Sequence, residues 1–250
     1  MSSLSVRVVG VGDAFTARYH NACLLLESGG TRLLVDAPPA LARALRDLSG
    51  HEPRAPEVGL DDIDHVLITH LHGDHVGGLE QLLFWRRFVT GRKAALHAIP
   101  EVLAGIWDTR LKGGMDTLMD RPGGPTRSLT LSDYADVHPL GPGTSTIGDL
   151  EIVWRPTIHH IPTSAIRVQS GRASFAYSAD TAFDPTLIDW LSQADLFFHE
   201  TNLGVHTPLS SLVELPVETR ARMRLIHYPD FHEVATSPIT CAVEGQRITL

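Results

Sequence analysis

The chain has 250 residues, 43% of them hydrophobic, with 21 Lys and Arg against 29 Asp and Glu, a formal net charge of −8. This length and apolar content allow a large buried core, whereas the acidic balance argues against a dedicated nucleic-acid surface, which needs basic side chains to neutralise phosphates. Residues 1–9 lack the pattern of a signal peptide and no run of 18 apolar residues exists, so we expect no membrane partner.

The organisation of the chain predicts one domain over residues 1–250. No low-complexity run or charged linker divides it, and a variable insertion of loops and helices is expected at about 100–148, where glycine and proline cluster. Cys23 and Cys241 are too few for a disulfide framework and lie in apolar sequence. We expect buried free thiols and a cytoplasmic location.

In chain order, the first elements are three strands and a helix. Apolar runs predict strands over 6–9, 22–27 and 31–35, the last two joined by a Ser28-Gly29-Gly30 turn that suits a hairpin. Residues 38–48 follow with Pro near the start and Leu41, Leu45 and Leu48 on one face, which predicts a helix.

The densest group of polar residues comes directly after an apolar run at 65–69. That run is typical of a buried strand, and His70, His72, Asp74 and His75 follow it at once. Imidazole nitrogens and carboxylate oxygens are natural ligands of Zn²⁺, and a set without thiolate suits a catalytic ion better than a structural one. The sequence therefore predicts a metal-binding loop at the end of a strand.

Beyond this loop, strands and helices alternate. Helical spacing continues from Leu79 to Phe88. Further strands are expected near 94–98, 150–158, 165–168, 173–178 and 196–198, and further helices near 100–111, 185–192 and 217–223.

The spacing His-x-His-x-Asp-His resembles the signature of the metallo-β-lactamase superfamily, and other segments match it in the expected order. They supply Asp36 after an early strand, His159 or His160 after a later one, Asp180 in a Tyr-Ser-Ala-Asp-Thr turn, and His227 after a late strand. The superfamily has Gly where this chain has Ala179. The resemblance implies an α/β fold, the αββα four-layer sandwich of the metallo-β-lactamase type.

The same resemblance implies a site for two divalent metal ions. Zinc is the favoured metal, with manganese or iron left open. His159 is preferred over His160, because a Pro-containing turn and a strand follow it as in ribonuclease Z-like members. Asp36 is expected to orient a ligating His rather than bind metal itself. The implied ligands are His70, His72 and His159 for the first ion, Asp74, His75 and His227 for the second, and Asp180 between them.

A second motif favours the ribonuclease Z-like, phosphodiesterase-like branch of the superfamily. Residues 195–201, Asp-Leu-Phe-Phe-His-Glu-Thr, resemble a His-Glu-Ala-Thr segment in which the His and Glu help to protonate a leaving alkoxide. His199 and Glu200 are therefore catalytic candidates. The interval from His159 to Asp180 is too short for the long arm with which tRNA-processing members grip tRNA.

The functional hypothesis is a dinuclear metal-dependent hydrolase. A metal-bridging hydroxide, oriented by Asp74, would attack a phosphodiester or related ester of a small molecule. A thioesterase, lactonase or sulfatase-type hydrolase on the same fold remains open. A mononuclear iron oxidoreductase is the alternative from a different class, and would not need His75 or His227. A homodimer is left open as an oligomeric state.

Overall fold

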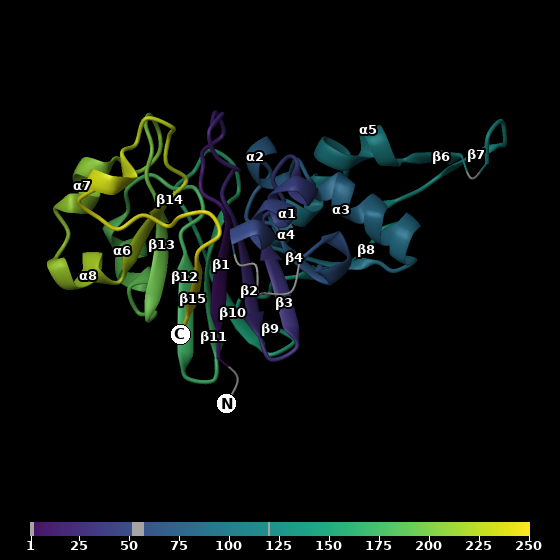
Figure 1. The fold of residues 1–250 in the computed structure, drawn as a ribbon. Coiled ribbons are helices and arrows are strands. Elements are labelled where there is room, and N and C mark those ends of the chain that lie inside the picture. Colours follow the sequence, from purple (N-terminus) through teal and green to yellow (C-terminus); the bar gives the residue numbers. More distant parts are fainter. Residues whose placement is uncertain (1–2, 52–57, 120) are drawn as a thin grey trace.

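Two β-sheets packed face to face form the centre of the molecule (Figure 1). The computed structural model describes residues 3–51, 58–119 and 121–250, with the backbone alone for 49–51. The first sheet has the strand order β15 (Arg247–Thr249), β1 (Ser5–Gly10), β2 (Cys23–Ser28), β3 (Thr31–Val35), β4 (His65–Leu67), β5 (Ala94–Ala98) and β8 (Ala135–Pro139). The second has the order β14 (Met223–Ile226), β13 (Leu196–Glu200), β12 (Ala173–Tyr177), β11 (Ser164–Ser170), β10 (Leu150–Pro156) and β9 (Ser145–Ile147).

Helices lie outside both sheets, which confirms the predicted αββα sandwich (Figure 1). Beside the first sheet lie α1 (Leu41–His51), α3 (Leu79–Trp85) and α4 (Pro100–Ile106), and beside the second lie α6 (Pro185–Leu191), α7 (Leu209–Val213) and α8 (Val217–Ala221). Shorter helices are α2 (Gly73–Val76) and α5 (Lys112–Met115). Wide π turns at Arg86–Thr90 and Trp107–Leu111 prolong α3 and α4, and single 3-10 turns occur at Leu60–Asp62, Leu131–Asp133 and Val234–Thr236.

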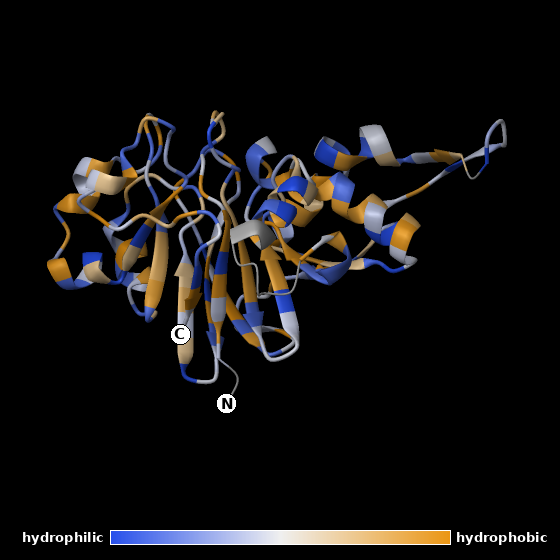
Figure 2. Ribbon diagram, in the orientation of Figure 1, coloured by the Kyte–Doolittle hydropathy of each residue, from blue (hydrophilic) through white to orange (hydrophobic). Residues whose placement is uncertain are grey.

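The core lies between and around the sheets, where the strands are mainly apolar (Figure 2). Every residue of β1 and β13 is buried, because these strands are covered on both faces. Cys23 and Cys241 are both buried and form no disulfide, as the sequence predicted.

Parallel pairing brings several strand ends to one edge. Strands β3, β4, β5 and β8 run parallel in the first sheet, and β12, β13 and β14 run parallel in the second. The carboxyl ends of parallel strands lie at the same edge of a sheet, and there the connecting loops are exposed and free to carry functional groups. This edge is at the top of Figure 1.

Several element boundaries differ from the prediction, and three of the differences have clear local reasons. Helix α1 begins at Leu41 rather than Pro38, because Ala40 has φ 57°, a left-handed conformation that no α-helix contains. Strand β10 ends at Pro156, which has no N–H for further pairing, and Ile158 is 56% exposed. Helix α8 ends at Ala221, because Met223 already belongs to the buried strand β14.

The region 100–148, expected to be a variable insertion, contributes partly to the sheets. Strands β8 and β9 belong to the first and second sheet, whereas β6 (Thr117–Met119) and β7 (Thr126–Ser128) form a separate hairpin. This hairpin projects away from the body of the molecule (Figure 1). None of the helices in the described ranges combines enough length with enough apolar residues to span a bilayer.

Candidate metal centre

The predicted ligands come from loops at the shared edge of the two sheets. Each follows a strand directly or lies in the short helix α2 after β4, so the pairing of the strands decides which side chains meet. His70 and His72 follow β4, Asp74 and His75 lie in α2, His159 follows β10, Asp180 follows β12, and His227 follows β14.

Four of these residues form one group around His72. His72 Nδ1 lies 3.0 Å from His70 Nε2 and 3.2 Å from His159 Nε2. Asp180 Oδ2 completes the group, 3.5 Å from His70 Nε2 and 3.9 Å from His159 Nε2. Burial lowers the pKa of His70 to about 3 and that of His159 to about 4, so both imidazoles are neutral near pH 7, as metal ligation requires.

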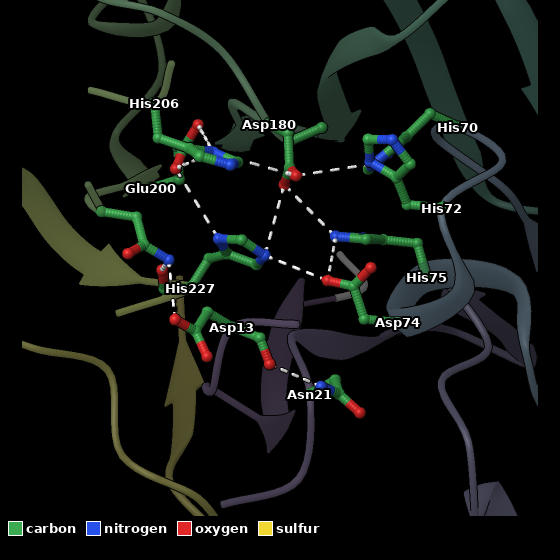
Figure 3. A network of polar contacts seen from close by, with 12 residues as sticks. Asp13, Asn21, His70, His72, Asp74, His75, Asp180, Glu200, His206 and His227 are labelled. Atoms are coloured by element: carbon green, nitrogen blue, oxygen red, sulfur yellow. Dashed lines mark hydrogen bonds and ion pairs between the residues drawn. The ribbon is translucent and has the colours of Figure 1, made fainter. Parts of the chain in front are cut away.

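A second group lies on the other side of Asp180. Asp74 Oδ2 is 3.2 Å from His75 Nε2 and 3.2 Å from His227 Nε2. Asp180 Oδ1 is 3.2 Å from His75 Nε2 and 3.6 Å from His227 Nε2. One oxygen of Asp180 therefore faces each group (Figure 3).

The donor atoms fit divalent metal ions. His75 Nε2 and Asp180 Oδ1 are buried and lie 3.2 Å apart as an ion pair, but neither makes a hydrogen bond, and a buried polar atom without one costs several kcal/mol by a rough measure. Burial favours neutral imidazole at His227, but Asp180 and Asp74 outweigh it and raise the pKa of His227 to about 10. The carboxylates thus stabilise a cation at this point, and a metal ion held by the same nitrogens would satisfy them.

The candidate ligand His75 is held by Asp36 on the side of the ring away from the other ligands. Asp36 Oδ2 lies 2.8 Å from His75 Nδ1, and both side chains are fully buried. Thr69 supports Asp36 through its backbone N–H at 2.8 Å and through its hydroxyl. Burial raises the pKa of Asp36, whereas His75 and Thr69 oppose that shift. The orienting role expected for Asp36 matches this geometry.

Three residues at this edge have left-handed backbone conformations. The φ angles are 64° at Asp36, 50° at Ala179 and 54° at His227. Such conformations cost a non-glycine residue of the order of 1–3 kcal/mol and are found mainly at functional sites. Ala179 stands where the superfamily has Gly, so this chain carries a strain there that the superfamily pattern avoids.

Beside the second group lies a histidine that the sequence did not single out. His206 Nδ1 is 2.9 Å from Glu200 Oε1 and 4.0 Å from Asp180 Oδ2 (Figure 3). Burial favours neutral imidazole, but the Glu200 carboxylate outweighs it and raises the pKa of His206. His206 also forms a third possible ligand group with Asp180 and His227. Nothing in its sequence spacing distinguishes it, since only the fold of the loop 201–207 brings it back to Glu200.

His199 does not join the centre. Side chains alternate along a strand, so His199 and Glu200 point to opposite faces of β13. His199 is fully buried, its Nδ1 lies 2.7 Å from the Glu200 carbonyl oxygen, and its Nε2 has no hydrogen-bond partner. Of the two residues proposed from the His-Glu segment, the structure brings only Glu200 to the metal centre.

Of the two neighbouring histidines, His159 is the one that joins the first ligand group. Its side chain is fully buried, whereas His160 is exposed. His160 Nε2 lies 2.9 Å from His72 Nε2, and both residues line the pocket. This placement agrees with the preference for His159.

The centre opens into a pocket of about 980 Å³. Asp74, Asp180, His206 and His227 line its floor, and residues 13–15 and 229–231 line its mouth. The pocket is large enough for a small organic molecule.

Comparison with known sequences shows the family to which the chain belongs. The family described as anti-Pycsar protein Apyc1 matches residues 4–240. An anti-Pycsar protein Apyc1 from Bacillus phage BSP38 is 32% identical, over 100% of this chain and 100% of the relative. The chain belongs to the Apyc1 family.

Solved structures similar to this Apyc1-family chain confirm the predicted metallo-β-lactamase fold. The metallo-β-lactamase fold protein YhfI from Bacillus subtilis superimposes with a TM-score of 0.76 at 20% identity, over 100% of both chains. The short form of human tRNase Z superimposes with a TM-score of 0.66 at 17% identity, over 98% of both chains.

In this Apyc1-family chain, the donor set is of the type that metal-dependent hydrolases use. It consists of imidazoles and carboxylates without thiolate, and it opens to a pocket instead of being closed by protein ligands.

Proposed function

We propose that the chain is a metal-dependent hydrolase of small phosphodiesters that holds two divalent ions. The observation that carries this proposal is the placement of Asp180, with Oδ2 toward His70 and Oδ1 toward His75. A carboxylate shared between two ligand groups suits a pair of ions. Zinc fits the nitrogen and oxygen donors, and manganese and iron are accepted by the same donors.

Two ions held there would lower the pKa of water and take up the negative charge of phosphoryl oxygens. Asp74 then has a positioning role in the reaction. Burial opposes its ionisation, but His75 and His227 hold its pKa well below the ordinary value. An ionised Asp74 at the pocket floor accepts a hydrogen bond from a water molecule and orients it toward the substrate.

His206 and Glu200 fit the departure of the leaving group. His206 lines the pocket, and its side chain is 20% exposed, whereas Glu200 is fully buried behind it. Because Nδ1 is held by Glu200, Nε2 is the atom that donates a proton to a leaving alkoxide. An alkoxide is a poor leaving group, so this donor raises the rate by about 10²–10⁴.

Charge and pocket size favour a small substrate over a polymer. The net charge is −8, and the pocket holds about 980 Å³. A cyclic or nucleotide-like diester satisfies both conditions, since it needs no extended basic surface.

The second ligand group also speaks against the mononuclear iron alternative. A single ion at His70, His72 and His159 would leave the second group of possible ligands, Asp74, His75 and His227, without an ion to bind. Thioester, lactone and sulfate ester hydrolysis differ from the proposal only in the substrate, so a substrate panel separates them.

The test uses purified protein loaded with zinc or manganese. We expect two metal ions per chain by elemental analysis, and hydrolysis of bis(p-nitrophenyl) phosphate and of cyclic nucleotides. Asp180→Asn should abolish hydrolysis and lower the metal content, whereas Asp189→Asn, an exposed carboxylate on α6, should change neither. A thioester, a lactone or an aryl sulfate as the preferred substrate would contradict the assignment, and so would one iron per chain in protein from its native host.

A further inference from the structure

Two phenylalanines stand exposed at the mouth of the pocket. Phe15 is 92% exposed and Phe231 is 67% exposed, and both line the same pocket as Asp180 and His227. Large apolar side chains left in water beside a reaction centre mark a surface that a ligand covers.

The backbones that carry the two rings are tied to each other. Asp230, next to Phe231, accepts hydrogen bonds from the Thr16 hydroxyl, from the Ala17 N–H at 2.8 Å and from the Arg18 N–H at 3.1 Å. The Phe15 N–H itself donates to Asp13 Oδ1 at 3.0 Å. The rings are therefore exposed on a fixed backbone, and a ligand that covers them has little chain to order.

Polar atoms at the mouth are occupied by these same contacts. Asp230 uses both carboxylate oxygens for Thr16, Ala17 and Arg18. Asp13 Oδ2 accepts a hydrogen bond from Asn202 Nδ2 at 2.9 Å (Figure 3). Phe15 and Phe231 therefore offer a ligand the faces of their rings. Such faces stack on flat aromatic groups without hydrogen bonds to the polar edges of those groups.

The backbones of Phe15 and Phe231 are held on a different side of the centre from His206, the proposed proton donor. His206 and Asp13 lie on opposite sides of His227 (Figure 3). The Phe15 N–H donates to Asp13 Oδ1, and Asp230, next to Phe231, is bound to Thr16, so the backbones that carry both rings are tied to the side of Asp13.

We propose that Phe15 and Phe231 bind a flat aromatic group that the substrate carries on the side of the phosphorus away from His206. This is the group that stays on the phosphate when the leaving alkoxide or phenolate departs. The inference rests on the proposed phosphodiesterase function, and it makes the two rings determinants of substrate affinity.

The test compares two diesters that release the same p-nitrophenolate. Bis(p-nitrophenyl) phosphate retains an aromatic group on the phosphate, whereas methyl p-nitrophenyl phosphate retains a methyl group. In metal-loaded protein, Phe15→Ala and Phe231→Ala should each raise KM for the first diester by about fivefold to a hundredfold, by the range known for base stacking on aromatic side chains. We expect kcat for the first diester and KM for the second to stay within about twofold, by the same reasoning.

Matched variants control for the substitution itself. Phe88→Ala removes a ring that is 53% exposed and packs on Phe84, outside the pocket lining, and should leave KM for both diesters unchanged. Phe15→Trp keeps an aromatic face and should keep the wild-type KM.

Three results would overturn the inference. One is an unchanged KM for bis(p-nitrophenyl) phosphate in both Ala variants, and another is an equal rise for both diesters. The third is a fall in the sedimentation mass of the variants with no change in KM, since the rings would then serve self-association. If the wild-type protein hydrolyses neither diester, the proposed function fails. The inference is then decided by whether Phe15→Ala weakens binding of p-nitrophenyl phosphate but not of methyl phosphate.

Discussion

Asp36 Oδ2 lies 2.8 Å from His75 Nδ1, with both side chains fully buried. This contact turns His75 Nε2 toward Asp74 and Asp180, to within 3.2 Å of each. Asp36 is itself held by Thr69, at the end of the segment that leads into the metal-binding loop. The geometry of the second ligand group therefore depends on a residue that does not belong to the group.

Asp36→Asn should weaken metal binding by about 10-fold to 100-fold, because an amide supports the basicity of a ligating imidazole less well than a carboxylate. The measurement is competition with a chromophoric chelator. Asp108→Asn is the control, since that carboxylate is 69% exposed and pairs only with Lys112 among the ion pairs of the described residues. Equal metal affinity in wild type and Asp36→Asn would contradict the orienting role.

His206→Gln should slow hydrolysis most for substrates with poor leaving groups. For an alkyl diester we expect kcat to fall by about 10²–10⁴, and by much less for a p-nitrophenyl ester, whose phenolate leaves without help. Glu200→Gln should act in the same direction, because Glu200 holds His206 through Nδ1. His138→Gln, at an exposed position on β8, serves as the control. A loss of rate that is the same for both leaving groups would disprove the proton-donor role.

His97 should make the fold sensitive to acid. Burial, together with His65 and His138, lowers the pKa of His97 to about 3. His97 is only 6% exposed. The unfolded chain therefore takes up a proton near the ordinary pKa of about 6.5, whereas the folded chain does so only near 3. Stability is complete above that ordinary value and is lost as the pH falls toward 3.

The measurement is the free energy of unfolding in urea, with chelator present so that metal release does not contribute. From pH 7.5 to pH 5.0, wild type should lose up to about 2 kcal/mol more than His97→Gln, which has no imidazole to protonate. Parallel losses in the two proteins would show that His97 does not couple folding to pH.

Ala40→Gly should stabilise the protein by about 0.5–1 kcal/mol. Ala40 is exposed and has φ 57°, so glycine removes a steric penalty of about 1–2 kcal/mol, less the entropy of a freer unfolded chain. Ala104→Gly, exposed within α4, should instead destabilise by about 1 kcal/mol. Thermal unfolding of the two variants should give shifts of opposite sign. Two destabilised variants would contradict the strain at Ala40.

The sequence by itself predicted most of the strands that carry the candidate ligands, and it named those candidates. Alternation and apolar runs are local, so β3, β5 and the ligand loop after β4 could be found from their own residues. Asp36, Asp180 and His227 followed from short motifs at strand ends. Strand β8 was missed because its residues 136–139 are exposed, and its position at the sheet edge leaves no apolar pattern to detect.

Only the tertiary structure decided how these groups face each other. It brings His206 rather than His199 to the candidate metal centre, because the alternation of side chains along β13 turns His199 away and the loop 201–207 returns His206 to Glu200. It also placed one oxygen of Asp180 toward each ligand group. The physical reason is that distances between side chains far apart in sequence depend on which strands pair and on the register of that pairing. Neither is encoded within the few residues that make up a motif.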